Sequence, residues 1–326
     1  MASEFAKSTL SPPAKPPRRW YQFTLRTAGI WIVLLCLLLG SFAWWRDRAE
    51  RQRKVVEEMR DLGATVDYRF FSLRKRDEEN EAEYASLYDA EEEFFLCKFL
   101  RDTFGDDFVY GVGEVRFSNS AYERPISPER TSSLLSHLPR FPHLKELRLE
   151  GNAFTGADLA KLPCLDSLER LVVFTRPNGP SGLLTNSDVA PLREAIRLKW
   201  LMLPRQPIGD SGVAQLTGLR ELVELDLSGT SITDGCFESL RHLPKLRSLD
   251  LSDTKITGEG FRTSKLPTSL SELDLSNTQV SDSALEDLVL PNLTDVWLHD
   301  TKVTAEGKKR LQVRYPNCKI VIENWP

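Results

Sequence analysis

A repeat dominates the C-terminal two-thirds of this 326-residue chain. Copies of one pattern begin at Leu144, Leu168, Leu198, Leu222, Leu246, Leu270 and Leu293, and a partial copy begins at Asn317. Successive copies are 24 residues apart, except for a 30-residue step after Leu168 and a 23-residue step after Leu270. We place the six extra residues at 176–181, and a degenerate copy begins at Val112. A fixed period of this length is typical of chains built from stacked units.

Each copy predicts a short strand followed by a turn and a short helix. Counting from the first leucine at Leu222, Leu225 and Leu227 at positions four and six point to one side of the strand. Position eleven is apolar, and Phe237 and Leu240 follow at helical spacing. One such coil buries too little apolar surface to offset the entropy of ordering it, so neighbouring coils must stack. The pattern therefore predicts a solenoid in which equivalent leucines align on adjacent strands.

Position nine is predicted to hold a structural polar ladder. Short polar side chains there can hydrogen-bond the backbone where the chain leaves the strand. They are Asn152, Thr230, Thr254, Thr278 and Thr301. Arg176 and Gln206 occupy the same position near the insertion, so the pattern leaves open whether the ladder continues there.

The copies LVELDLSGT, LRSLDLSDT and LSELDLSNT closely follow a known repeat consensus. On these residues the chain resembles leucine-rich repeat proteins over about residues 112–326. Together with an apolar N-terminal segment, the layout is similar to bacterial membrane-anchored leucine-rich repeat domain proteins. The resemblance implies an α/β solenoid, a horseshoe with a parallel β-sheet on its concave face, preceded by one transmembrane helix.

The apolar segment runs from Ala28 to Trp45 and contains no charged residue. Eighteen helical residues extend about 27 Å, close to the thickness of a bilayer core. Tryptophan and tyrosine flank the segment as interfacial aromatic residues do. A cleaved signal peptide is the alternative, since Ser41-Phe42-Ala43 fits a small-x-small cleavage site. Five basic residues lie on either side, so the positive-inside rule does not give an orientation.

These features predict four regions, with a single-pass membrane localisation and the side of the repeat domain left open. They are a disordered Pro-rich tail (1–19), a transmembrane helix (20–45), a juxtamembrane helix with an acidic linker and an N-terminal cap (46–111), and the leucine-rich repeat domain (112–326). Within the third region, charges of both signs predict a solvated helix over 46–62, and alternation predicts a strand near Val66 and Tyr68. An acidic linker (74–93) and a capping helix with phenylalanines at 94–104 follow.

Residues between the buried leucines face the inner curve of the predicted horseshoe. Adjoining large apolar side chains on such a face often mark contacts with a partner. Acidic side chains in adjacent copies lie about 4.8 Å apart and repel by roughly 0.9 kcal/mol in water, which a basic partner or a cation would relieve. The candidate partner-binding residues are Val172, Phe174, Trp200, Met202, Asp226, Asp250, Asp274 and Trp297. Local packing under the insertion and a soluble Asp-Leu-Ser consensus are the alternative explanations.

Composition and motifs narrow the function classes. The net charge of −4 provides no basic field for nucleic acid. Five cysteines without regular spacing do not form a disulfide framework, and four distant histidines form no short metal motif. Phosphate-binding, serine-hydrolase and zinc-protease motifs are missing from the sequence, so we expect no enzyme activity, cofactor, metal or catalytic residue.

The sequence favours a membrane-anchored scaffold that binds a protein or peptide through its concave face. An envelope-associated structural or glycan-binding module is the first alternative, because Trp200 and Trp297 are candidate sugar-stacking residues. A resemblance to F-box leucine-rich repeat adaptors is the second, although the chain has no F-box before the repeats and the membrane helix fits such a protein poorly. The expected partners are a protein or peptide and the lipid bilayer, with no nucleic acid.

Overall fold

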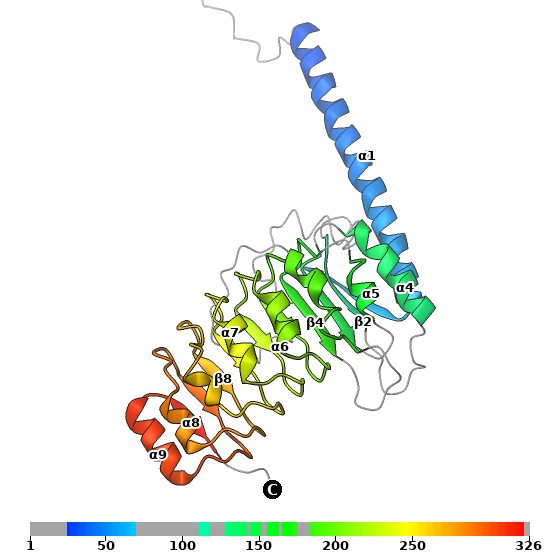
Figure 1. Ribbon diagram of the computed structural model, residues 1–326. Coiled ribbons are helices and arrows are strands. Elements are labelled where there is room, and N and C mark those ends of the chain that lie inside the picture. The colour runs from blue at the N-terminus through cyan, green and yellow to red at the C-terminus, as the bar shows by residue number, and fades with distance from the viewer. Residues whose placement is uncertain are drawn as a thin grey trace, which may run out of the picture. The chain divides into compact units, whose positions relative to one another are not determined.

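The computed structural model describes residues 25–69, 111–117, 128–141, 144–150, 155–162, 165–174 and 183–322. The chain divides into two compact units between Arg48 and Ala49. The first contains most of a long helix, and the second contains the repeats. Figure 1 shows the order of these elements along the chain.

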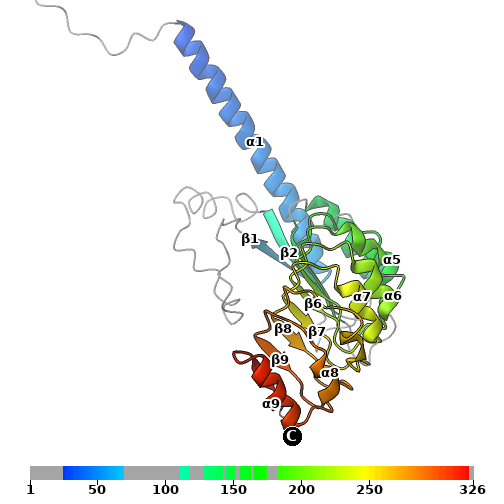
Figure 2. The same cartoon turned by 60° about the vertical axis from the view of Figure 1, so that its left-hand side comes forward.

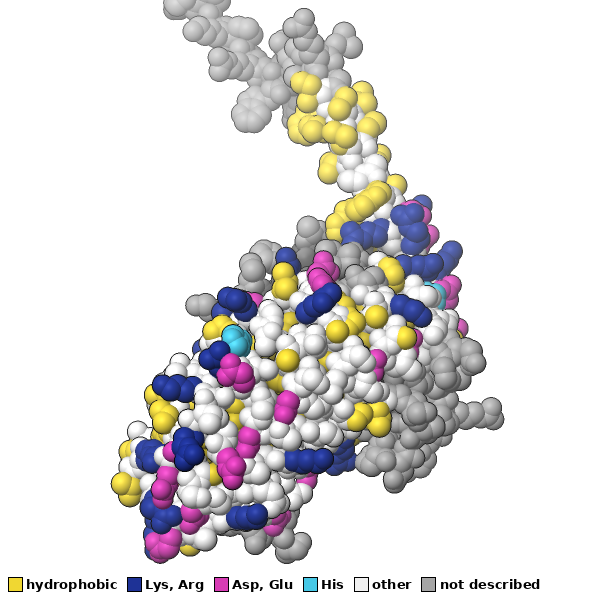
Figure 3. Space-filling model, in the orientation of Figure 1, with side chains coloured by type: hydrophobic (Ala, Val, Ile, Leu, Met, Phe, Trp, Pro, Cys, Tyr) yellow, Lys and Arg dark blue, Asp and Glu magenta, His cyan; other side chains and the backbone are white. Residues whose placement is uncertain are grey.

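Helix α1 (Leu25–Asp61) is a continuous helix of 37 residues. Its N-terminal part is long and apolar enough to cross a membrane, with a mean hydropathy of 1.5 and no buried residue in the apolar window. Hydrophobic side chains cover this part in the space-filling view (Figure 3). At its end, the rings of Trp44 and Trp45 meet edge to face, and Arg48 lies 5.7 and 5.8 Å from their centroids. An aromatic pair beside arginine is typical of the boundary between lipid and water.

The second unit is built on one ten-stranded sheet whose strands follow chain order. Strand β1 pairs antiparallel with β2, and all later pairs are parallel. The degenerate copy at Val112 forms β2, which pairs in parallel with β3. The strands are β1 (Ala64–Arg69), β2 (Gly111–Phe117), β3 (Glu146–Glu150), β4 (Arg170–Phe174), β5 (Trp200–Met202), β6 (Glu224–Asp226), β7 (Ser248–Asp250), β8 (Glu272–Asp274), β9 (Asp295–Trp297) and β10 (Lys319–Val321).

From β2 onward, short helical segments lie between successive strands. Figure 2 shows the helices from α5 to α8 together on one side and the strands on the other. The α-helices are α4 (Pro128–His137), α5 (Gly156–Leu159), α6 (Asp210–Val213), α7 (Phe237–Leu240), α8 (Asp282–Glu286) and α9 (Ala305–Arg314). The 3₁₀ turns are η2 (Leu138–Arg140), η3 (Ala190–Glu194), η4 (Ala214–Leu216), η5 (Asp234–Cys236) and η6 (Glu259–Phe261).

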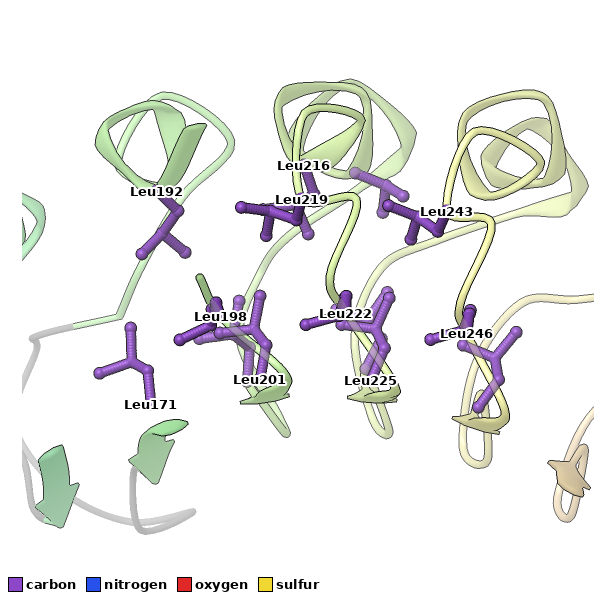
Figure 4. Packing of buried hydrophobic residues seen from close by; sticks show 14 of the residues in the cluster. Leu171, Leu192, Leu198, Leu201, Leu216, Leu219, Leu222, Leu225, Leu243 and Leu246 are labelled. Atoms are coloured by element: carbon purple, nitrogen blue, oxygen red, sulfur yellow. The ribbon is translucent and has the colours of Figure 1, made fainter. Parts of the chain in front are cut away.

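The core consists of leucine rows that run through the stack. Leu225, Leu249 and Leu273 occupy matching positions on adjacent strands and are at most 1% exposed, as the repeat predicts. A second set of leucines faces them from the helical segments, so that each coil packs against the coils on both sides (Figure 4). Apolar burial between coils is the main favourable contribution to a fold of this kind.

The polar ladder at position nine forms in the described coils and includes Gln206. Thr230, Thr254 and Thr278 each donate a hydrogen bond to the carbonyl of the leucine three residues earlier, at 2.6 Å. Gln206 takes the same place in an earlier coil and is 1% exposed. Its amide donates to the Pro204 carbonyl at 3.1 Å and accepts from the Leu184 amide at 2.8 Å. The ladder therefore continues at Gln206, where a longer side chain satisfies the buried backbone groups.

A second ladder joins neighbouring coils before each helical segment. Asp210 accepts hydrogen bonds from the backbone and hydroxyl of Thr233, and Asp234 does the same for Thr257. Asp282 repeats the arrangement with Thr304, at 2.8 and 2.6 Å. Gly258 stands at the equivalent position between these pairs, with φ +84° and no room for a β-carbon beside Ala284. One coil-to-coil link thus lacks this carboxylate.

Position eight of the coils that contain β5 to β9 has a left-handed backbone. Gly229, Asp253, Asn277 and Asp300 occupy it with φ between 48° and 66°. Glycine, asparagine and aspartate are the residues that tolerate this conformation best. Arg205 also occupies it, with φ 58°, and its longer side chain makes it the strained member of the series.

Replacing Arg205 with asparagine is expected to raise the free energy of unfolding by about 1 kcal/mol, because asparagine adopts the left-handed backbone at lower cost. Thermal or chemical denaturation measures the change. Lys255→Asn is the control, since Lys255 is exposed and is not among the residues with positive φ. An Arg205→Asn protein that is less stable than the parent would contradict this reading of the turn.

The N-terminal end of the repeat core differs from the sequence prediction. The segment 46–62 is predicted as a solvated helix, but Val55, Val56 and Met59 are at most 5% exposed and belong to the repeat core. The predicted strand near Val66 forms as β1, and Val66 is 2% exposed in the same core. The end of α1 and β1 therefore cover the first coils, because the alternating charges occupy only the outward side of the helix.

Several predicted segments lie outside the described residues. They are the Pro-rich tail (1–19), the acidic linker (74–93), the capping helix (94–104), the insertion (176–181), and the position-nine residues Asn152 and Arg176.

Candidate functional site

The eight candidate residues all lie on the strands, on the side of the sheet opposite the core. Strand pairing places Val172, Met202, Asp226, Asp250, Asp274 and Trp297 in one continuous row across β4 to β9. Trp200 lies in the neighbouring row, between Arg170 and Glu224. Phe174 lies at the end of β4. We refer to this side of the sheet, formed by positions three, five and seven, as the sheet face.

The predicted apolar group is contiguous but less exposed than the sequence suggests. Phe174 is 38% exposed, whereas Val172, Trp200 and Met202 are half-buried. Val172 and Met202 are direct cross-strand neighbours. Their partial burial comes from packing along the sheet, so only part of each side chain is available to a partner.

Cationic side chains flank Trp200. The Arg170 guanidinium lies 4.9 Å from the ring centroid, and the Lys199 ammonium lies 5.9 Å from it. Glu169 holds Lys145 and Lys199 at 2.6 and 2.8 Å. Burial tends to raise the pKa of Glu169, but hydrogen bonds and attraction from the two lysines outweigh it, and the pKa falls below its usual value. The Trp200 ring therefore lies beside two cationic side chains, those of Arg170 and Lys199.

Two buried carboxylates near the start of the sheet were not singled out from the sequence. Glu114 and Glu146 are 5% and 1% exposed and lie side by side on β2 and β3. Arg116 pairs with Glu114 at 3.0 Å, and Arg148 contacts Glu146 at 2.8 Å and Glu114 at 3.4 Å. This end of the sheet face is therefore neutralised within the protein, since buried charges are stable only when paired.

Asp226, Asp250 and Asp274 form what we call the acidic row. Among the described residues, no arginine pairs with these carboxylates as Arg116 and Arg148 pair with the two glutamates. One carboxylate oxygen of Asp226 and of Asp250 accepts hydrogen bonds from the backbone and hydroxyl of the serine two residues later, at 2.6–2.9 Å. The backbone amide of Ser276 makes the same contact with Asp274 at 2.8 Å. These bonds orient three half-buried carboxylates along the row in strand register. The turn that follows each strand thus sets the direction of each charge.

Burial and like charge disfavour ionisation in this row. Burial raises the pKa of Asp250 above its usual value, and Asp226 and Asp253 raise it further, against the serine hydrogen bonds that lower it. The pKa of Asp274 is also raised by burial and by Asp250, while Ser276 and His299 act in the opposite direction. The repulsion expected from the repeat spacing is therefore present on the folded face.

Asp250→Asn is expected to stabilise the protein at pH 7 by about 0.5–1 kcal/mol, the scale of one cross-strand repulsion. Because the folded pKa of Asp250 is raised, its ionisation costs stability as the pH rises through that pKa. The gain should disappear below about pH 3, where aspartate is protonated in both states. Melting curves across pH test this, with the exposed Asp287→Asn as the control. A parent that is more stable than Asp250→Asn at pH 7 would refute the repulsion.

Other chemistry finds little support among the residues that the structure describes. No group of three or more His, Cys, Asp or Glu residues in this part of the chain could hold a metal ion. Burial raises the pKa of Cys236 far above its usual value and that of Cys318 to about 11, so neither thiol ionises near neutral pH. A hollow of about 160 Å³ is lined by residues outside the strands, including Phe261, Leu266 and Leu288.

Comparison with known proteins finds one repeat family. A family model described as a leucine-rich repeat matches residues 242–262 and 267–289. No curated protein matches the chain. Among solved structures, an internalin from Listeria monocytogenes is 18% identical, with a TM-score of 0.46. The alignment covers 65% of this chain and 55% of the internalin, so the chain matches about half of that protein.

The family match falls on the coils around β7 and β8, where the leucine rows and the threonine ladder are most regular. The neighbouring coils continue the same register in both directions. The chain is a leucine-rich repeat protein.

Proposed function

We propose that the protein is a membrane-anchored scaffold that binds another protein through its sheet face. The observation that carries the proposal is the row from Val172 to Trp297, in which apolar and acidic side chains from successive strands line one surface. Repeat solenoids use such extended surfaces to bind partners. The leucine-rich repeat architecture supports a protein-interaction role in general.

Site-directed photo-crosslinking in cells tests the choice of surface. A photoreactive phenylalanine in place of Ser248, at the centre of the sheet face, is expected to form discrete crosslinks to another protein. The matched control places the same residue at Gln215, which is exposed on the helical side. Crosslinks at Gln215 alone would refute binding through the sheet face. Trp200→Ala and Asp250→Lys should each reduce the Ser248 crosslink.

Membrane anchoring is supported by the apolar part of α1 and by the Trp44, Trp45 and Arg48 cluster. The full chain is expected to stay with membranes in alkaline carbonate and to be released by detergent. Leu35→Arg together with Leu38→Arg should shift it to the soluble fraction, because charge at the centre of a span is costly. A mature N-terminus just after Ala43 would instead identify a cleaved signal peptide.

A further inference from the structure

We propose that the segment bound on the sheet face is a basic, extended polypeptide that crosses β5 to β9 and carries an apolar residue near each end. The inference rests on the proposed function and specifies its partner by charge and length. Three features of the described strands support it: an acidic row that makes no ion pair with a lysine or arginine of the described residues, apolar side chains at both ends of that row, and a neutralised region beyond it.

The length follows from the strand register. Met202, Asp226, Asp250, Asp274 and Trp297 occupy five successive strands in one row. Four strand spacings of about 4.8 Å separate the two apolar ends by roughly 19 Å. An extended chain rises about 3.3 Å per residue, so about six residues cross this distance. Such a segment would lie along the solenoid, across the strands.

The charge of the partner follows from the hydrogen bonds and charges around the acidic row. Asp226 and Asp250 each direct one carboxylate oxygen to a serine, and no hydrogen bond from the described residues reaches their second oxygen. No lysine or arginine of the described residues forms an ion pair with Asp250, and the nearby Asp226 and Asp253 are like-charged. Glu272, in the neighbouring row, is exposed and adds to the negative potential. Lysine or arginine side chains of a partner would supply the missing positive charge.

The contrast with the first strands supports this assignment. Glu114 and Glu146 are also adjacent carboxylates, but Arg116 and Arg148 neutralise them within the protein. In the row of Arg116 and Arg148 the arginines end with β3, and this row continues with Val172 and Met202 before the aspartates begin. Arg170 on β4 lies in the neighbouring row, beside Trp200. The sheet face thus changes from self-paired to apolar to acidic along its length. A partner with an apolar end followed by basic residues matches that order.

The apolar ends give the segment its anchors. Val172, Trp200 and Met202 form one half-buried group, and Trp297 lies directly beside Asp274 at the other end of the row. Tryptophan and methionine are enriched at protein interfaces, and partly buried aromatic side chains often carry much of the binding energy. Charge alone would attract any polycation, so these anchors are what would select a polypeptide.

The experiment measures fluorescence anisotropy of labelled synthetic peptides with the full chain in detergent micelles. The probe has about seven residues, with leucine and tryptophan at its ends and three lysines spaced by glycines between them. One comparison peptide replaces the lysines with glutamates, and another replaces both end residues with alanine. Spermine competes as a polycation without apolar ends. We expect saturable binding of the first peptide only, weakening at least tenfold from about 50 to about 500 mM salt.

The decisive variant is Asp226→Asn with Asp250→Asn and Asp274→Asn, which keeps an acceptor for each serine but removes three charges. We expect it to bind the basic peptide about tenfold more weakly, the sum of three modest ion pairs. Met202→Ala with Trp297→Ala should weaken binding similarly. The control is Glu238→Gln with Glu259→Gln and Glu286→Gln, which removes three exposed charges outside the strands and should leave affinity unchanged. Circular dichroism and melting curves confirm that each variant folds.

Equal binding of the lysine and glutamate peptides, no binding of either, or equal affinity for the two triple variants would overturn the proposal. Complete displacement by spermine at equal charge would also overturn it, because the apolar ends would then contribute nothing. The scaffold function is judged separately by the Ser248 crosslink. A crosslink at Ser248 without binding of the basic peptide leaves the scaffold in place and rejects only the basic partner.

Discussion

Met59→Asp is expected to lower the free energy of unfolding of the repeat unit by about 3–5 kcal/mol. Met59 is fully buried at the end of α1, among the residues of the repeat core. An aspartate there would place an unpaired charge in an apolar environment, and relief would require separating the end of the helix from the first coils. Chemical denaturation followed by tryptophan fluorescence measures the loss.

The matched control introduces aspartate five residues earlier on the same helix. Lys54 is exposed on the same helix, so Lys54→Asp should change stability by less than about 0.5 kcal/mol. Equal effects of the two substitutions would mean that the end of α1 contributes little to the repeat core.

Leu249→Ala is expected to cost about 3–4 kcal/mol, the usual range for a leucine removed from a rigid core. Leu249 is 1% exposed and lies between Leu225 and Leu273 on adjacent strands. Because the coils stack only on their neighbours, the resulting cavity removes contacts on both sides of β7. The midpoint of denaturant unfolding should fall accordingly.

Ser248→Ala tests whether the effect belongs to the core. Ser248 precedes Leu249 on β7 and lies on the sheet face, so its loss should change stability by less than about 0.5 kcal/mol. A Leu249→Ala protein with an unchanged midpoint would contradict the stacked-leucine core.

The repeat pattern predicts most of the second unit because it is periodic. Leucines such as Leu225 and Leu249 recur at one spacing, and a constant spacing leaves one way to bury them all. The buried face of α1 was missed because Val55, Val56 and Met59 lie outside that period, among charges of both signs. The left-handed turns can also be predicted from the sequence. Gly229 and Asn277 occupy the same place in their coils, and both residue types tolerate a left-handed backbone.

The candidate face is predictable as a set of positions, but its charge pairing is not. Strand register follows from the repeat, so the neighbours of Asp250 in the row can be read from the sequence. Whether a carboxylate is neutralised depends on side chains that cross between strands, as Arg148 does between Glu146 and Glu114. Such contacts depend on rotamers and burial, which a sequence pattern does not specify.

The constant coil makes the length of the sheet face adjustable in whole steps. Removing residues 229–252 would join Ser228 to Asp253, which already has the left-handed backbone that Gly229 provides. Every later leucine would keep its neighbour, and Thr257 would meet Asp210 in place of Asp234. The sheet-face row of the shortened protein would lose one carboxylate, that of Asp250, and about 4.8 Å of length. Gain or loss of a coil is therefore a route by which relatives of this protein can come to prefer shorter or longer ligands without rebuilding their interior.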